Sequence, residues 1–386
     1  MKVFFERVGD YNLIKLKEVI LRVFKFNGFF DRFDKQSKIL LKPNLLKAAI
    51  PEKVVTTHPA VFEAIISVLK DNGYNNICAG DSPGVGDPID VAKKSGILDI
   101  CNKYNIEFKQ FLESRKVSVK DHLRVKNIWI WDKVQDFDIV INLPKLKTHC
   151  LMLMTLGVKN FYGLLPGKSN KANGHFQSRT HEDFSSLLID IFNTVESIIP
   201  VFSIIDGIWG MEGEGPGSGD KIETKVIWAS FDAFLMDFAV VQWLNIPLEK
   251  YPIYNVYSRV FSSRKEELDN MLKITGRFEK EFILPEIQDV SFSKIPLFVK
   301  KLYNRVCYTY PVILKDKCIK CMNCKNSCPP ETIYIVDNYP EIKYNKCIKC
   351  FCCHEMCPVQ AIIIKKSLIL KIFDKAVYFV QKSFRI

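Results

Sequence analysis

The sequence has no hydrophobic run long enough to cross a membrane. None of its apolar stretches reaches the ~18 uninterrupted residues that a spanning helix needs. The first ten residues, MKVFFERVGD, become charged at once and hold no apolar segment before a small-residue cleavage site, so a secretory signal is not expected. We therefore expect a cytoplasmic protein.

Motifs that read nucleic acid are also missing, although the chain is basic. Its 386 residues carry a formal net charge of +12, which suits nucleic acid, an anionic substrate, a membrane surface or an acidic redox partner. The lysines are spread along the chain, and neither a helix-turn-helix nor a set of base-stacking aromatic residues occurs. Nucleic acid is therefore disfavoured, and an anionic small molecule and a redox partner protein are the expected partners.

The cysteines carry the clearest chemical signal. Nine of the 13 lie between Cys318 and Cys357, and eight of these form the spacing C-x2-C-x2-C-x3-C-P twice. Zinc sites usually take paired C-x2-C units, whereas this triple followed by Cys-Pro is typical of four-iron, four-sulfur clusters. The sequence therefore predicts an iron–sulfur protein with two 4Fe-4S clusters and a role in electron transfer, in a reducing compartment.

The fourth cysteine of each run is expected to bind the cluster of the other run, as in two-cluster ferredoxins. Cys352 replaces Asn323 of the first run and is not expected to be a ligand. Lysines beside the ligands, among them Lys320 and Lys349, are expected to raise the cluster potentials. The predicted ligand sets are Cys318, Cys321, Cys324 and Cys357 for one cluster and Cys347, Cys350, Cys353 and Cys328 for the other.

An internal repeat of 29 residues divides the C-terminal part from the rest. Lys317-Cys-Ile-Lys-Cys recurs at Lys346, which is typical of one structural unit used twice. The expected organisation is an α/β domain at 1–290, a linker or packing segment at 291–315, a small α+β ferredoxin-like domain at 316–364 and a basic amphipathic helix at 365–386. That helix either packs on its own protein or docks on an anionic membrane surface.

Short apolar runs alternate with amphipathic stretches through the first domain. Strands are predicted at 38–41, 76–79, 138–142, 202–205 and 225–229, and helices from Pro59 to Gly73, from a Thr180 cap to before Pro200, and over 233–244. This alternation is typical of an α/β domain with a largely parallel sheet.

Polar loops follow three of the predicted strands. Ligands of such sheets bind beyond the carboxyl ends of the strands, so these loops predict a shared cleft; the plainer alternative is ordinary turns. The expected ligand of the cleft is an anion or a metal. A cationic strip continues from the cleft through Lys159, Asn160 and Lys168. The candidate lining residues of the cleft are Lys42, Asn44, Asp81, Lys145, Lys147 and His149.

Two further features are less specific. His175 and His181, with His149, suit either a metal or general acid–base site or plain capping and core roles. Residues 207–220 (GIWGMEGEGPGSGD) are expected to form a long glycine-rich loop. This loop has no dinucleotide or P-loop spacing, and Glu212 and Glu214 suit a hard cation or a lid better than a phosphate.

Residues 1–245 resemble the family called domain of unknown function 362. Members of that family often carry an appended two-cluster ferredoxin, as here, so the resemblance implies an association with redox proteins but no particular reaction. The stretches that carry it are Lys42-Pro-Asn-Leu-Leu, Thr57-His-Pro, Gly80-Asp-Ser-Pro-Gly, Asn142-Leu-Pro-Lys-Leu-Lys-Thr-His, Leu156-Gly-Val-Lys-Asn and Asp206-Gly-Ile-Trp-Gly-Met-Glu-Gly.

Two functions follow from these features. The first is an electron-transfer oxidoreductase, in which the clusters relay single electrons to or from a substrate or cofactor in the N-terminal cleft. The alternative is a non-enzymatic carrier or scaffold that passes electrons or clusters to a partner protein. The sequence names no substrate, so whether the chain is an enzyme stays open.

Overall fold

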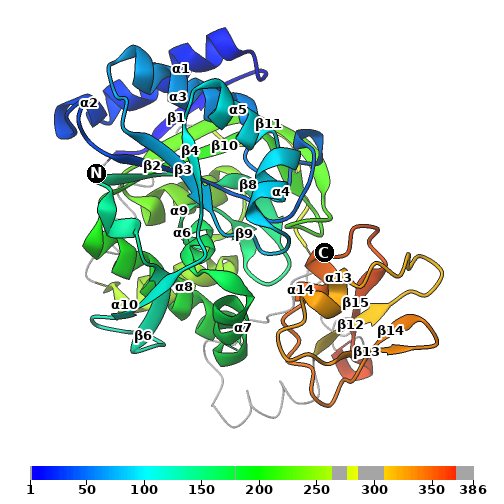
Figure 1. Ribbon diagram of the computed structural model, residues 1–386. Coiled ribbons are helices and arrows are strands. Elements are labelled where there is room, and N and C mark those ends of the chain that lie inside the picture. Colours follow the sequence, from blue (N-terminus) through cyan, green and yellow to red (C-terminus); the bar gives the residue numbers. More distant parts are fainter. Residues whose placement is uncertain (1, 179, 263–275, 286–307, 371–386) are drawn as a thin grey trace. The chain divides into compact units, whose positions relative to one another are not determined.

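A computed structural model describes residues 2–178, 180–262, 276–285 and 308–370. The chain divides into two compact units, Met1–Pro285 and Glu286–Ile386, and each is described by itself (Figure 1). Among the described residues, no helix is long and apolar enough to span a bilayer.

The first unit is built on a mixed sheet that has nine strands in its described part. Neighbours from β10 to β4 run parallel, whereas the pairs β1–β11, β10–β11 and β8–β9 are antiparallel. The predicted α/β fold with a largely parallel sheet is confirmed. The sheet order is β1 (Phe4–Arg7), β11 (Asp220–Ser230), β10 (Val201–Glu212), β7 (Ile139–Leu143), β2 (Ile39–Pro43), β3 (Ile77–Asp81) and β4 (Glu107–Gln110), with β8 (Lys145–His149) also pairing β10 and β9 (Leu153–Thr155) pairing β8.

Helices cover both faces of this sheet (Figure 1). On one side lie α1 (Leu13–Phe26), α3 (Pro59–Asp71) and α5 (Ile97–Lys103), whose apolar faces join the sheet in one continuous core. On the other side lie α6 (Gly157–Asn160), α8 (His181–Ile198) and α9 (Ala233–Trp243). The unit also contains α2 (Phe29–Arg32), α4 (Pro88–Lys94), α7 (Gly167–Gln177), α10 (Pro252–Val260) and the hairpin of β5 (Ser114–Ser118) and β6 (Asn127–Trp131).

Local sequence signals predict where two helices begin, but they do not predict the extent of the glycine-rich segment. The α3 helix begins at Pro59, and Thr180 caps α8 by accepting the N–H of Asp183 at 3.0 Å, as predicted. The predicted loop at 207–220 is wrong in extent, because residues 207–212 belong to β10 and β11 begins at 220. A Cβ on Gly207 would lie 2.9 Å from the Val226 oxygen, so this glycine serves close strand packing rather than loop flexibility.

The second unit repeats one pattern twice. The 29-residue repeat relates α13 (Asn323–Asn326) to α14 (Cys352–Glu355) and also relates its strands. The strands pair across the two repeats, since β12 (Thr309–Ile313) pairs with β15 (Ile362–Lys366) and β13 (Ile333–Val336) with β14 (Tyr339–Ile342), all antiparallel. The two repeats are therefore interlocked.

Two predicted segments differ in this unit. The end of the predicted linker forms β12, and Lys365 and Lys366 belong to β15 rather than to the predicted basic helix. Residues 371–386, which hold most of that predicted helix, lie outside the described residues, as do residues 286–307.

Candidate iron–sulfur centres and the buried polar network

Two cavities in the second unit are each lined by four cysteines. They enclose about 310 and 290 Å³ of space that no atom fills, including the part open to solvent. Each takes three cysteines from one run and the fourth from the other run, which is the grouping that the crossed assignment expects. The groups are Cys318, Cys321, Cys324 and Cys357 in one cavity and Cys347, Cys350, Cys353 and Cys328 in the other.

The backbone around the cavities fits a cluster with thiolate ligands. Lys320 and Lys349, inside the two C-x2-C turns, both have a φ of +57°, and the Lys349 N–H donates to the Cys347 sulfur at 3.4 Å. The Thr332 N–H donates to the Cys328 sulfur at 3.4 Å, and the Ala361 N–H donates to the Cys357 sulfur at 3.1 Å. The remaining lining is mostly apolar and includes Ile313 and Ile362 in one cavity and Ile333 and Ile342 in the other.

Burial favours the protonated form of two of the ligand thiols, Cys324 and Cys353. Burial raises the pKa of the Cys324 thiol to about 11, and burial also raises the pKa of Cys353 well above its ordinary value. Iron ligation requires thiolates, so cluster binding displaces these protons. Two lysines beside the ligands lie against aromatic rings, with Lys320 Nζ 4.2 Å from the Tyr339 ring centre and Lys349 Nζ 3.6 Å from that of Tyr308.

In the first unit, a buried ion pair joins the ends of β2 and β3. Lys42 Nζ lies 2.9 Å from Asp81 Oδ1, and the two side chains are 0% and 2% exposed. Burial raises the pKa of Asp81 and lowers that of Lys42, and each partner's charge opposes the shift of the other. A Cβ on Gly163 would lie 2.4 Å from Asp81 Oδ1, so the backbone at Gly163 packs directly against the pair.

A second buried pair joins β8 to β10. Lys145 Nζ lies 2.7 Å from Asp206 Oδ2. The Tyr11 hydroxyl accepts from Lys145 Nζ at 2.9 Å and donates to Asp206 Oδ1 at 2.9 Å, and its ring stacks on His58 with centres 3.5 Å apart. Burial lowers the pKa of His58 to about 4, so its imidazole is neutral at pH 7.

A chain of amide side chains anchors α6 to the strand ends. The Asn160 amide donates to Asn142 Oδ1 at 2.8 Å and accepts from the Asn44 amide at 2.9 Å. Asn142 in turn donates to the Gly157 oxygen and to Ser203 Oγ, both at 3.0 Å. These contacts fix the orientation of the side-chain amides of Asn44, Asn142 and Asn160.

Lys171, on α7, reaches the loop after β3 and was not among the predicted residues. Its Nζ donates to Ser82 O at 2.7 Å, to Ser82 Oγ at 2.7 Å and to Pro83 O at 2.8 Å. Burial lowers the pKa of Lys171 from 10.5 to about 7, an effect that Asp81 partly opposes. The loop is therefore held by an amine that titrates near neutral pH.

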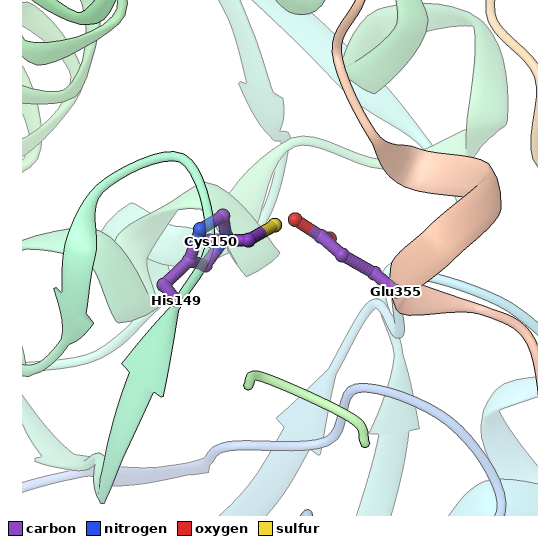
Figure 2. Close-up of side chains that lie close together, drawn as sticks. All are labelled: His149, Cys150 and Glu355. Atoms are coloured by element: carbon purple, nitrogen blue, oxygen red, sulfur yellow. The ribbon is translucent and has the colours of Figure 1, made fainter. Parts of the chain in front are cut away.

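The turn after β8 gathers further basic side chains. Lys145, Lys147 and His149 occupy alternate positions of β8 and so share one face of the strand. Lys147 Nζ donates to the Val55 oxygen at 2.6 Å, and His149 Nδ1 accepts the N–H of Leu151 at 3.1 Å, which leaves the hydrogen of the neutral ring on Nε2. Figure 2 shows His149 and Cys150 at this turn.

The charge around His149 is positive. Burial lowers the pKa of His149 well below 6.5, and Lys159, His175 and Lys147 lower it further. His175 stacks on the Phe184 ring with centres 4.7 Å apart, and Lys159 Nζ lies 6.0 Å from the centre of the same ring. The His175 pKa falls to about 3 by burial and by Lys159, so both imidazoles are neutral at pH 7.

The six predicted cleft residues are packed into the body of the first unit. Five of them are buried, Asn44 is half-buried, and all six make hydrogen bonds or ion pairs there. The strip beyond β8 is only partly described, because the Lys168 side chain lies outside the description. Of the residues not predicted, His58 and Asp206 lie in stretches that carry the family resemblance, whereas no sequence signal marks Tyr11 or Lys171.

Comparison with known proteins identifies both units. A model of the domain of unknown function 362 (DUF362) family matches residues 39–242, just over half of the chain. The chain belongs to this family. A model of 4Fe-4S dicluster domains matches residues 310–358, so the second unit of this DUF362 protein is an iron–sulfur domain of ferredoxin type.

Two individual proteins resemble this DUF362 chain. A thylakoid-associated protein of Synechocystis sp. is 35% identical over 227 residues, which cover 58% of this chain and 68% of that protein. A crystal structure of a Thermotoga maritima protein matches 60% of this chain and 58% of that chain, with a TM-score of 0.36 and 13% identity. The second likeness carries no structural argument.

Proposed function

We propose that this chain is an electron-transfer oxidoreductase in which two 4Fe-4S clusters relay single electrons to or from a substrate or cofactor held by the first unit. The observation that carries the proposal is the division of eight cysteines into two groups of four around two separate cavities. Bound 4Fe-4S clusters supply one-electron redox chemistry.

The chain's own residues set the conditions for that chemistry. The amides of Thr332 and Ala361 donate to the sulfurs of Cys328 and Cys357, which stabilises negative charge on those ligands and raises the potential. The apolar lining limits access of water to most of the cysteines, whereas Cys321 is exposed. In the first unit, which would hold the substrate or cofactor, the ion pair of Lys145 and Asp206 holds β8 against β10.

We place the ligand of the first unit at the turn after β8 and assign it phosphate or carboxylate groups. Lys147 and Lys159 supply positive charge around the neutral rings of His149 and His175, and an anion would offset this concentration of cations. Thermal denaturation with inorganic phosphate or citrate tests the site. Both anions should raise the melting temperature of the wild type more than that of Lys159→Gln, and equal shifts would count against an anion site here.

Cluster content and redox turnover test the relay. The protein, reconstituted without oxygen, should hold about eight iron and eight sulfide ions per chain and show paramagnetic resonance after one-electron reduction. If the first unit binds a redox-active substrate, candidate oxidised substrates added one at a time should include one that reoxidises the reduced protein. Clusters that dithionite fails to reduce would indicate a purely structural role and would refute the relay.

The second candidate is a carrier that donates electrons or whole clusters to a partner protein. It is favoured by the burial of most of the predicted cleft residues, each of which makes hydrogen bonds or an ion pair within the first unit. Cluster transfer separates a cluster donor from the relay. A donor should lose its clusters to an apo-acceptor protein within a mixing experiment, whereas a relay should keep them.

We also propose that the protein works in the cytoplasm and contacts a membrane surface there through its basic C-terminal segment. The name of the Synechocystis relative, a thylakoid-associated protein, supports the membrane contact. Flotation with anionic vesicles tests it. The full chain should float, and a chain without residues 371–386, which retains every described residue, should not; identical behaviour would contradict the proposal.

A further inference from the structure

Part of the first cysteine run lies at the surface of the second unit. In the first run, Ile319 is 60% exposed and Cys321 is exposed. The positions 29 residues later, Ile348 and Cys350, are both half-buried. Because electron tunnelling falls steeply with distance, the exposed Cys321 brings the cavity of the first run within reach of a partner protein.

Positive charge surrounds this exposed run. Lys317, Lys320 and Lys325 are all exposed, and the nearest carboxylate in the sequence is Asp316. Lys315, also exposed, is already paired with Glu341 at 2.9 Å. The run therefore presents a cationic rim.

An apolar centre lies inside that rim. Ile319 and Val359, which is 37% exposed, both line the cavity of Cys318, Cys321, Cys324 and Cys357. A small apolar centre within a charged rim suits a weak, short-lived complex, in which complementary charge speeds encounter more than it strengthens binding.

We propose that residues 317–325 are the docking surface for an acidic one-electron redox protein, and that electrons enter or leave through the cluster held by Cys318, Cys321, Cys324 and Cys357. Each encounter moves one electron: the partner's cofactor is oxidised as the cluster is reduced, or the reverse, and no bond or proton changes place. The inference rests on the proposed relay and names both its partner class and its point of contact.

The repeat supplies a matched pair of variants for the test. Lys317→Glu and Lys346→Glu make the same charge change at equivalent positions of the two runs, and both lysines are exposed. The probe is a reduced, acidic plant-type [2Fe-2S] ferredoxin, mixed with the reconstituted protein in an oxygen-free stopped-flow experiment at low salt.

Lys317→Glu should lower the second-order rate about threefold to tenfold and weaken its dependence on salt, whereas Lys346→Glu should change it little. A basic carrier, cytochrome c, accepting electrons from the reduced protein should show no loss with Lys317→Glu. Equal slowing of the two variants by the acidic probe, or no slowing in either, would overturn the docking surface.

Two controls separate the docking surface from cluster damage. Iron content and the rate of reduction by dithionite should match between the variants, because a small reductant needs no docking. If Lys317→Glu loses iron, Lys325→Gln replaces it, with the same slowing expected at a smaller size. A protein that dithionite cannot reduce would refute the relay itself, whereas normal reduction with equal variants would refute the docking surface alone.

Discussion

Pairs of cysteine substitutions distinguish the crossed arrangement of the cavities from a sequential one. Cys318 and Cys357 line the same cavity, whereas Cys328 lines the other. Changing Cys318 and Cys357 together to serine therefore alters one cavity and leaves four cysteines in the second. Changing Cys318 and Cys328 together leaves three cysteines in each.

The arithmetic of iron follows from these positions. A full complement is about eight iron atoms per chain, so Cys318→Ser/Cys357→Ser should retain about four, and Cys318→Ser/Cys328→Ser should retain close to none. A sequential arrangement, in which each run holds its own cluster, gives the reverse order. The two double variants therefore differ by about one whole cluster in either case.

Iron and sulfide analysis after anaerobic reconstitution measures the outcome, and paramagnetic resonance of the reduced proteins counts the remaining clusters. Cys352→Ser is the control, because Cys352 is buried in the second run but is absent from the lining of both cavities. Its iron content should match the wild type. A higher iron content in Cys318→Ser/Cys328→Ser than in Cys318→Ser/Cys357→Ser would refute the crossed reasoning.

Three further predictions concern buried polar residues of the first unit. Asp81→Asn should lower the free energy of unfolding by about 3–5 kcal/mol because it leaves the Lys42 ammonium buried without its counter-ion, whereas Lys42→Met with Asp81→Leu should cost much less; denaturant titration compares them, and equal losses would contradict the pairing. Gly163→Ala should cost about 1–3 kcal/mol in the same titration, since its Cβ has no room beside the pair, and an unchanged midpoint would count against that packing. Between pH 7 and the ordinary Lys171 pKa of 10.5, the folded chain binds fewer protons at Lys171 than the unfolded chain, so this group raises stability as the pH rises through that window. Thermal denaturation at pH 7, 8 and 9 should show a shallower rise in Lys171→Met, and parallel curves would refute the assignment.

The sequence alone was sufficient where the chemistry is local. Ligand spacing within one run predicts the three closely spaced cysteines of each group, because the short C-x2-C turns bring those thiols together whatever surrounds them. The fourth cysteine of each group comes from the other run and was predicted from the pattern of two-cluster ferredoxins. The α3 start at Pro59 and the Thr180 cap were also predictable, since each depends on neighbours within one helical turn.

The buried polar network was out of reach because its partners are distant in the chain. Lys145 and Asp206 are 61 residues apart, and Tyr11 and Asp206 are 195 apart. A lysine reads as a solvated residue in the sequence, and only the fold shows that Lys145 is 1% exposed. The prediction for the glycine-rich segment failed for a related reason: Gly207 and Gly210 pack against neighbouring strands, which the local sequence does not reveal.

The strand exchange between β12 and β15 also bears on how the protein is made. The β12 strand, at Thr309–Ile313, finds its partner only when Ile362–Lys366 has been synthesised. The cavity of Cys318, Cys321 and Cys324 likewise lacks its fourth cysteine until Cys357 has been synthesised. Iron delivered earlier would meet an open, three-cysteine pocket, so cluster insertion belongs after both repeats have been synthesised and have closed on each other.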